Sequence, residues 1–166
     1  LTGCRMREAI QLRTSDIQQT TDGTWFINWK HETQTKYPML LKSKSSNNRM
    51  MPIHQVLIDK GLLKIDRSHD GRLFKDAPQV VNTHSSHFKE LLIRLDIWVW
   101  KKKVGHSLRN NARDLWREAG IPRDVRDSFT GHAAVGAGEK YYGEGFASMP
   151  DKLNEYLKKI DVSWLP

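Results

Sequence analysis

The sequence predicts a mainly α-helical fold with a small amount of β-structure, on two observations. Apolar residues recur at helical spacing in three segments, all of them in the second half of the chain. Short strand-like runs bounded by polar residues fall within the first 53 positions. The chain has 166 residues, of which 38% are hydrophobic, and this is enough for one core. We therefore expect a single domain.

The first half of the chain contains the expected strands. Residues 5–12 have the pattern of a short helix, and residues 24–29 have the aromatic and β-branched composition of a strand. Two further strand-like pieces, 38–41 and 49–53, flank residues 43–48, whose polar composition is typical of a hairpin loop. A lysine lies at this predicted turn.

The second half of the chain contains the expected helices. Each shows apolar residues three or four positions apart, a spacing that places them on one core-facing side. Gly120 and Pro122 are typical of a helix end followed by a new start. The three stripes consist of Phe88, Leu91, Leu92 and Leu95; of Leu108, Ala112, Leu115, Trp116 and Ala119; and of Leu153, Tyr156, Leu157 and Ile160.

The chain is strongly basic. Its 27 Lys and Arg residues outnumber its 19 Asp and Glu residues, so the formal charge is +8 and the pI is about 9.7. A charge of this sign favours a polyanionic partner, and nucleic acid is the first candidate. The alternative is a basic protein whose charge is scattered over its surface, which net charge alone does not exclude.

Cysteine usage and the chain ends bear on the compartment. Cys4 is the only cysteine, so no internal disulfide is possible and the cytoplasm is the expected location. No apolar run approaches the roughly 20 residues that cross a bilayer, and residues 1–5 lack the pattern of a signal peptide. The chain opens without Met on a glycine-containing turn, as a fragment of a longer protein would.

The first cluster of chemistry-bearing residues is the segment T-G-C-R-M-R-E at residues 2–8. Gly3 permits a sharp turn that would place Arg5 at the start of a helix, and Glu8 follows one turn later on the same face. An ordinary surface ion pair of Arg5 with Glu8, worth little energetically, is the simpler explanation of this segment taken alone.

The second cluster is G-H-S-L-R at residues 105–109. The i, i+3 spacing puts the imidazole of His106 and the guanidinium of Arg109 on one helix face, where both can reach one phosphate. The simpler alternatives are that His106 caps the helix and that Arg109 is a solvated charge beside the lysines at 101–103.

The third cluster contains the tyrosines. Gly131 and His132 are followed, nine residues after the histidine, by Tyr141 and then by Tyr142. Taken alone, His132 is more typical of a structural histidine, and paired tyrosines are more typical of packing than of catalysis.

The ordered combination of these clusters resembles the tyrosine recombinase (phage integrase) family. T-G-x-R-x-x-E is followed by a lysine, then H-x-x-R, then G-H and a tyrosine, over nearly the whole chain. In that family the lysine lies on a strand hairpin shortly before an Arg-x-x-Pro segment. Lys44 matches this spacing to Arg49 and Pro52, and Lys42 is the second candidate.

Details of the motifs place the resemblance nearest to integrases of phages and integrating conjugative elements. There, Gly-Glu-x-Tyr around the nucleophile is similar to residues 138–141 of this chain. Two departures are Cys4, where leucine is usual, and Tyr142, which makes the nucleophile ambiguous on composition alone. The family's spacing from His132 favours Tyr141.

The resemblance implies the fold and the domain organisation. It implies a mainly α domain with a small antiparallel β-sheet (α+β), the fold of DNA breaking-rejoining enzymes. Residues 1–166 would then be a C-terminal catalytic domain, truncated at its N-terminal side and without the N-terminal DNA-binding domain.

The resemblance also implies roles for the residues named above. Tyr141 would attack the scissile phosphate to give a 3′-phosphotyrosine, and two arginines would bind the non-bridging oxygens. Lys44 would protonate the leaving 5′ oxygen, His106 would assist proton movement at the tyrosine and His132 would donate a further hydrogen bond. Glu8 would orient the cluster. The implied catalytic set is Arg5, Lys44, His106, Arg109, His132 and Tyr141.

No cofactor or metal is expected. The sequence has no Walker loop and no clustered carboxylates, and His84-x-x-His87 has no obvious further ligands. The implied partners are double-stranded DNA attachment sites, a homotetramer held together on DNA by the C-terminal segment, and DNA-bending accessory proteins, with no membrane. We expect a cytoplasmic, nucleoid-associated bacterial protein.

The expected function is a site-specific recombinase that integrates or excises a mobile element. A type IB topoisomerase or a telomere resolvase would use a similar residue set and treat the cut ends differently. A non-catalytic DNA-binding regulator on the same fold is the alternative from another class, and a metal-dependent nuclease is a third.

Overall fold

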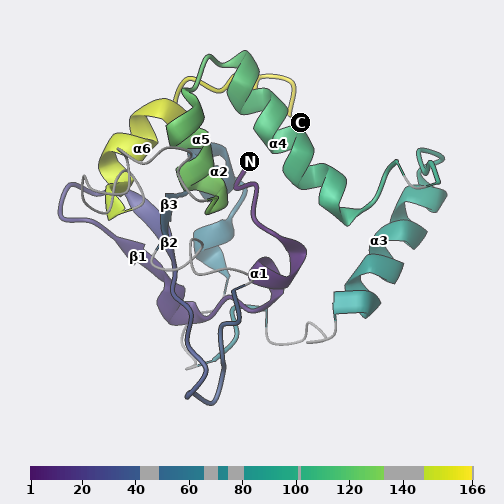
Figure 1. Cartoon of the computed structure of the whole chain (residues 1–166), viewed down its shortest axis with the longest axis horizontal. Coiled ribbons are helices and arrows are strands. Elements are labelled where there is room, and N and C mark those ends of the chain that lie inside the picture. The colour runs from purple at the N-terminus through teal and green to yellow at the C-terminus, as the bar shows by residue number, and fades with distance from the viewer. Residues whose placement is uncertain (42–48, 66–70, 75–80, 101, 133–147, 166) are drawn as a thin grey trace.

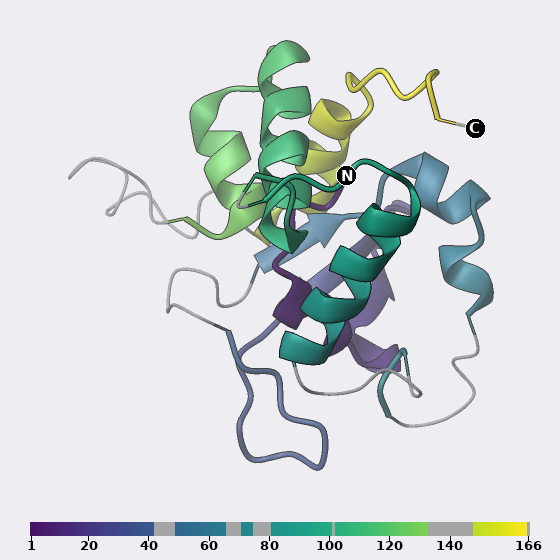
Figure 2. The same ribbon diagram turned by 90° about the vertical axis from the view of Figure 1, so that its right-hand side faces the viewer.

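The computed structural model describes residues 1–41, 49–65, 71–74, 81–100, 102–132 and 148–165. Their arrangement is shown in Figures 1 and 2. The described residues also include short 3-10 helices at 14–16 and 62–64. The main elements are α1 (Met6–Ile10), β1 (Ile17–Gln19), β2 (Trp25–Trp29), β3 (Arg49–Pro52), α2 (Gln55–Asp59), α3 (Val81–Arg94), α4 (Gly105–Glu118), α5 (Arg123–Thr130) and α6 (Pro150–Leu157).

The described strands form one antiparallel sheet in the order β1-β2-β3. Ile17 pairs with Ile27 at one side of β2, and Phe26 pairs with Pro52 at the other. The combination of helices with a small antiparallel sheet agrees with the α+β class expected above.

One expected strand is absent and an unexpected one is present. Residues 38–41 do not pair with β3, because Met39 instead makes an isolated bridge with Glu32. The partner of β3 is β2, whose aromatic run offers the longer apolar face. Strand β1 was not predicted, because only Ile17 among its three residues is buried, which leaves little apolar pattern to detect.

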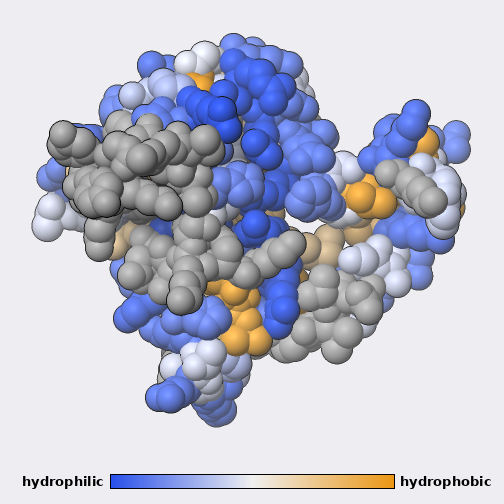
Figure 3. Space-filling view, in the orientation of Figure 1, coloured by the Kyte–Doolittle hydropathy of each residue, from blue (hydrophilic) through white to orange (hydrophobic). Residues whose placement is uncertain are grey.

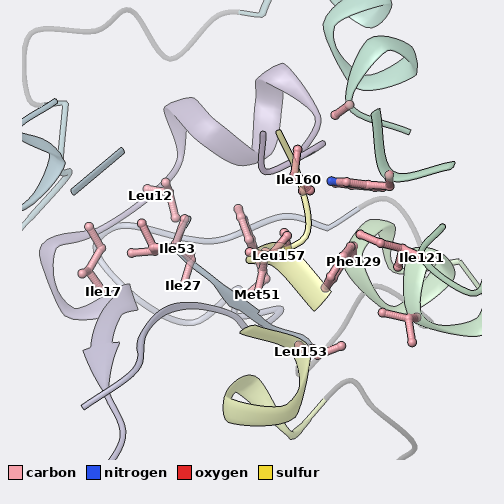
Figure 4. Close-up of a cluster of buried hydrophobic side chains, with 14 of the residues drawn as sticks. Leu12, Ile17, Ile27, Met51, Ile53, Ile121, Phe129, Leu153, Leu157 and Ile160 are labelled. Carbon is pink, nitrogen blue, oxygen red and sulfur yellow. The ribbon is translucent and has the colours of Figure 1, made fainter. Parts of the chain in front are cut away.

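The hydrophobic core lies between the sheet and helices α5 and α6. Figure 4 shows Met51 of β3 beside Leu157 of α6, with Phe129 of α5 close by. Trp116 of α4 is fully buried and packs edge-on against Phe129, with ring centroids 5.0 Å apart. The stripes predicted for α4 and α6 therefore face the core, apart from Leu108, which is 55% exposed.

Helix α3 departs from the expectation. It stands to one side of the molecule in Figure 1 and lies in front of α1 in Figure 2. Of its predicted core-facing stripe only Leu92 is buried, while Leu91 and Leu95 are exposed. The stripe has the right periodicity, but the main contacts of α3 among the described elements are with α1 and α4, and its residues are not part of the core cluster.

Among the described helices, none has the length and apolar character that a membrane span requires.

Candidate functional site

A tight turn at Gly3 begins the site. The backbone there has φ +57°, a left-handed conformation that favours glycine. A Cβ at this position would lie 2.3 Å from a ring carbon of the buried Trp116. Glycine is therefore required by backbone conformation and by packing, and the turn fixes where Arg5 leaves for α1.

Arg5 is held by Glu8 from the first turn of α1. Its Nη1 donates to Glu8 Oε1 at 2.8 Å, and its backbone N–H donates to Glu8 Oε2 at 2.9 Å. The side chain of Glu8 is only 2% exposed. The pair is thus not the ordinary surface ion pair considered from the sequence, and the Arg5 side chain, 21% exposed, is oriented from beneath.

Glu8 binds a second guanidinium from the sheet. Arg49, the first residue of β3, donates from Nη2 to Glu8 Oε2 at 3.0 Å and is 1% exposed. Its guanidinium also lies over the ring of Trp29, 4.5 Å from the centroid. Burial raises the pKa of Glu8, but the charge of Arg49 and the hydrogen bonds from Arg5 outweigh it, so the net pKa is below the usual value.

Arg109 of α4 makes hydrogen bonds to the turn at Gly3 and to the end of α5. From α4, its Nη1 donates to the carbonyl of Gly3 at 2.6 Å, and its Nη2 donates to the carbonyl of Thr130 at 2.8 Å. It is 3% exposed, which excludes the solvated charge considered above. Burial, together with the charge of Arg5, lowers the pKa of Arg109 to about 10, so it remains a cation at neutral pH.

His132 lies just after α5, beside Arg109. Its Nε2 is 3.5 Å from Arg109 Nη2, and its Nδ1 is 2.9 Å from the hydroxyl oxygen of Thr130. Burial and the positive charges of Arg109 and Arg113 lower its pKa below the usual value, against a smaller opposing effect of Asp127. In the absence of an anion, His132 is therefore neutral at neutral pH.

A groove of about 570 Å³ is lined by two residues of this site, Arg5 and Arg109. Figure 3 shows a hollow between the region of α3 and that of α4. His106, the second residue of α4, is exposed and lines the groove, so it does not cap the helix; Val104 precedes the first turn. Among the described residues, the lining contains no carboxylate and five cationic side chains: Arg5, Arg7, Lys89, Lys103 and Arg109. The groove is therefore suited to an anion such as a phosphodiester.

Part of the predicted set falls outside the described residues. Lys44, its alternative Lys42, and both Tyr141 and Tyr142 lie in the ranges 42–48 and 133–147. The site as described thus contains Arg5, Glu8, His106, Arg109 and His132.

Two polar contacts of the site were missed by the sequence reasoning. Arg49 was noted only as part of a spacing motif, although its arginine-to-proline pattern could have pointed to a buried partner. Nothing in the sequence singled out Thr130. Its importance shows only in the folded structure, where its hydroxyl contacts the imidazole of His132 at the end of α5. Within the described residues, no three His, Cys, Asp or Glu side chains gather so as to hold a metal ion.

Comparison with known protein families identifies the family of the chain. A family model described as the phage integrase family matches residues 1–146. No curated protein and no solved structure matches the chain.

Proposed function

Since this chain belongs to the phage integrase family, that of the site-specific tyrosine recombinases, we propose that it cuts and rejoins DNA through a phosphotyrosine at Tyr141. The observation that carries this proposal is that Arg5 and Arg109 line one cationic groove, with His132 beside Arg109. They come from the segment before α1, from α4 and from the segment after α5.

In the proposed reaction the phenolic oxygen of Tyr141 attacks the scissile phosphorus. The bond from phosphorus to the 5′ oxygen breaks as the bond to tyrosine forms, so the phosphodiester energy is kept in the adduct. Arg5 and Arg109 stabilise the charge on the non-bridging oxygens, and His132 donates one further hydrogen bond. Glu8 positions Arg5.

Two proton transfers complete the step. Lys44 supplies the proton that the departing 5′ oxygen takes up, and His106, on the groove beside Arg109, accepts the proton that Tyr141 loses. The proposed role of Lys44 is supported by its sequence position shortly before Arg49, which pairs with Glu8 of the site. Attack on the phosphotyrosine by a 5′ hydroxyl from another strand reverses the reaction and completes strand exchange.

The biological reaction proposed is the integration or excision of a mobile element at double-stranded DNA attachment sites. We propose that it takes place in a homotetramer on DNA, assisted by DNA-bending proteins, in association with the bacterial nucleoid.

The test is covalent trapping on nicked DNA. The protein is incubated with nicked duplexes of random sequence, whose short 5′-hydroxyl fragments diffuse away after cleavage, and adducts that survive detergent are selected and sequenced. We expect Tyr141→Phe to abolish the adduct while DNA binding is nearly kept, and Tyr142→Phe to retain it. An adduct mapped by mass spectrometry to Tyr142 would disprove the assignment of the nucleophile.

The same assay separates the alternative functions. Adduct formation in excess EDTA is not expected of a metal-dependent nuclease, and a non-catalytic regulator would give no adduct at all. On intact duplexes that carry the recovered site, a recombinase is expected to exchange strands between two duplexes, whereas a type IB topoisomerase would reseal each cut strand to its own end.

A further inference from the structure

The hydroxyl of Thr130 occupies a buried position between a helix end and the imidazole of His132. Thr130 is the last residue of α5 and is 0% exposed. Its Oγ1 lies 3.1 Å from the carbonyl oxygen of Arg126, 3.2 Å from that of Asp127 and 2.9 Å from Nδ1 of His132. One hydroxyl thus faces two backbone acceptors and one ring nitrogen.

The number of available protons determines which group donates in the hydrogen bond between Thr130 and His132. A hydroxyl has one proton, and both carbonyls can only accept it. When Thr130 donates to the helix end, its oxygen accepts from Nδ1–H of His132. Neutral His132 then carries its proton on Nδ1 and has a lone pair on Nε2.

The other side of the ring favours the same tautomer. Nε2 lies 3.5 Å from Nη2 of Arg109, and an arginine can only donate. An N–H on Nε2 would point at a cation, whereas a lone pair there is attracted to it. Thr130 on one side of the imidazole and Arg109 on the other therefore both favour the Nδ1–H tautomer.

We propose that Thr130 is a positioning residue, whose buried hydroxyl accepts from Nδ1–H of His132 and so holds Nε2 toward the phosphate-binding side of Arg109. The inference rests on the function proposed above and extends it to a residue that has no part in the motif resemblance.

The charges around the ring explain what changes when DNA binds. Arg109 and Arg113 of α4 and Arg5 before α1 oppose a positive charge on His132, whereas Asp127 of α5 favours it. Asp127 Oδ1 is 3.6 Å from Nδ1, beyond hydrogen-bond range. A phosphate seated between these arginines adds negative charge, which raises the pKa of His132, and the ring takes up a proton at Nε2.

The protonated ring can donate at both ends without turning. Nδ1–H stays on Thr130, and the new Nε2–H donates to a non-bridging oxygen of the phosphate. The hydroxyl serves as acceptor in the neutral and in the charged state, so the bound phosphate meets a donor that is already oriented.

The first experiment needs no DNA. In the free protein labelled with ¹⁵N at histidine, the ring nitrogen shifts of His132 at pH 8 report its tautomer. We expect Nδ1–H in the wild type and in Thr130→Ser, and a change toward Nε2–H in Thr130→Val, which keeps the branched shape but not the acceptor. An Nε2–H tautomer in the wild type would overturn the proposal even if Thr130→Val does not fold.

The second experiment measures the pH dependence of single-turnover cleavage, on a sequence recovered from the trapping assay. Because cleavage uses the protonated ring, the rate falls as the pH rises through the pKa of His132 in the DNA complex. Losing a hydrogen bond to a charged group should move this fall about one pH unit lower in Thr130→Val. Thr130→Ser should restore the wild-type profile.

The outcomes distinguish this inference from the proposed function. A uniform loss of rate in Thr130→Val with an unchanged pH profile means a purely structural role and contradicts the inference. A wild-type protein that never forms the Tyr141 adduct contradicts the proposed function instead, while the tautomer measurement still decides whether Thr130 holds His132.

Discussion

At the scale of single residues, the carboxylate of Glu8 accepts hydrogen bonds from two guanidinium groups. Arg5 belongs to the groove, whereas Arg49 is 1% exposed and has no other counter-charge among its described ion pairs. Its Nε and Nη1 also lack hydrogen-bond partners among the described residues. Removing the charge of Glu8 therefore leaves a buried cation uncompensated, which is far more costly than the loss of an exposed pair.

We predict that Glu8→Gln lowers the free energy of unfolding by about 3 kcal/mol or more. The matched control is Glu155→Gln, which breaks an exposed pair with Lys158 and should cost less than about 1 kcal/mol. Urea titration of both variants checks the prediction, and equal losses would mean that the buried pair contributes no more than a surface one.

The effect of Glu8→Gln should depend on pH in a defined direction. Since the folded pKa of Glu8 lies below its ordinary value of 4.5, its charge contributes stability that is fully present above pH 4.5. This contribution is lost as the pH falls through the folded pKa. The difference in urea midpoint between wild type and Glu8→Gln should therefore shrink below pH 4.5, and a constant difference would contradict the assignment.

Lys44 is the residue whose proposed role has the sharpest chemical test. As general acid, its removal should slow cleavage by roughly 10²- to 10⁴-fold. Replacing the 5′ bridging oxygen with sulfur should restore most of the rate in Lys44→Ala, because a thiolate leaves without needing a proton. The measurement is single-turnover cleavage on matched oxygen and sulfur substrates.

Two controls accompany the Lys44 experiment. Arg5 and Arg109 variants should gain less from sulfur, since these side chains act on the non-bridging oxygens. Lys42→Ala is the positional control: rescue of Lys42→Ala in place of Lys44→Ala would make Lys42 the acid, and rescue of neither would place the proton donor elsewhere.

At the scale of elements, the turn before α1 is held against α4 by contacts on both sides of one glycine. The carbonyl of Gly3 accepts from Arg109, and its Cα faces the ring of Trp116. We predict that Gly3→Ala displaces Arg5 from the groove. It should lower adduct formation and destabilise the fold by more than the roughly 1–2 kcal/mol of a left-handed alanine.

Gly120→Ala is the matched control for this prediction. Gly120 has a similar φ of +68°, but a Cβ there meets nothing within 4 Å. Gly120→Ala should lower the free energy of unfolding only by the cost of the left-handed backbone, and it should leave adduct formation unchanged. Thermal unfolding and trapping of both variants check this, and similar results for the two would show that contact with Trp116 does not matter.

At the scale of the whole molecule, the segment after α6 presents an exposed aromatic side chain. Trp164 is 60% exposed, although its Nε1 donates to the carbonyl of Asp161 at 3.1 Å. Val162, by contrast, packs against the core. Deleting residues 163–166 should therefore spare the fold and remove a surface that we propose docks on a neighbouring protomer.

We predict that this deletion weakens cooperative assembly on DNA more than single-site binding. Gel-shift titration on one-site and paired-site duplexes measures the two affinities separately. Trp164→Ala should reproduce most of the effect. Equal losses on both duplexes would mean that the segment contacts DNA or supports the fold and does not join protomers.

The sequence by itself determined the core-facing stripes of α4 and α6 and the strands β2 and β3, because their apolar residues follow a local periodicity. It also determined the family, because the order and spacing of the motifs can be read directly from the sequence. It did not determine where the stripe of α3 would lie, since periodicity defines a face but not what covers it. Nor did it predict β1, which has one buried residue.

Only the tertiary structure decided which polar groups meet. Glu8 joins Arg49 across 41 positions, and Arg109 joins Gly3 across 106. Thr130 reaches His132 only because α5 ends in a left-handed turn at Gly131. Such contacts follow from the packing of the chain, and burial together with neighbouring charges then sets the charge states of Glu8, Arg109 and His132. Local sequence patterns predict neither these contacts nor these charge states, because desolvation and long-range Coulomb interactions exist only once the chain has folded.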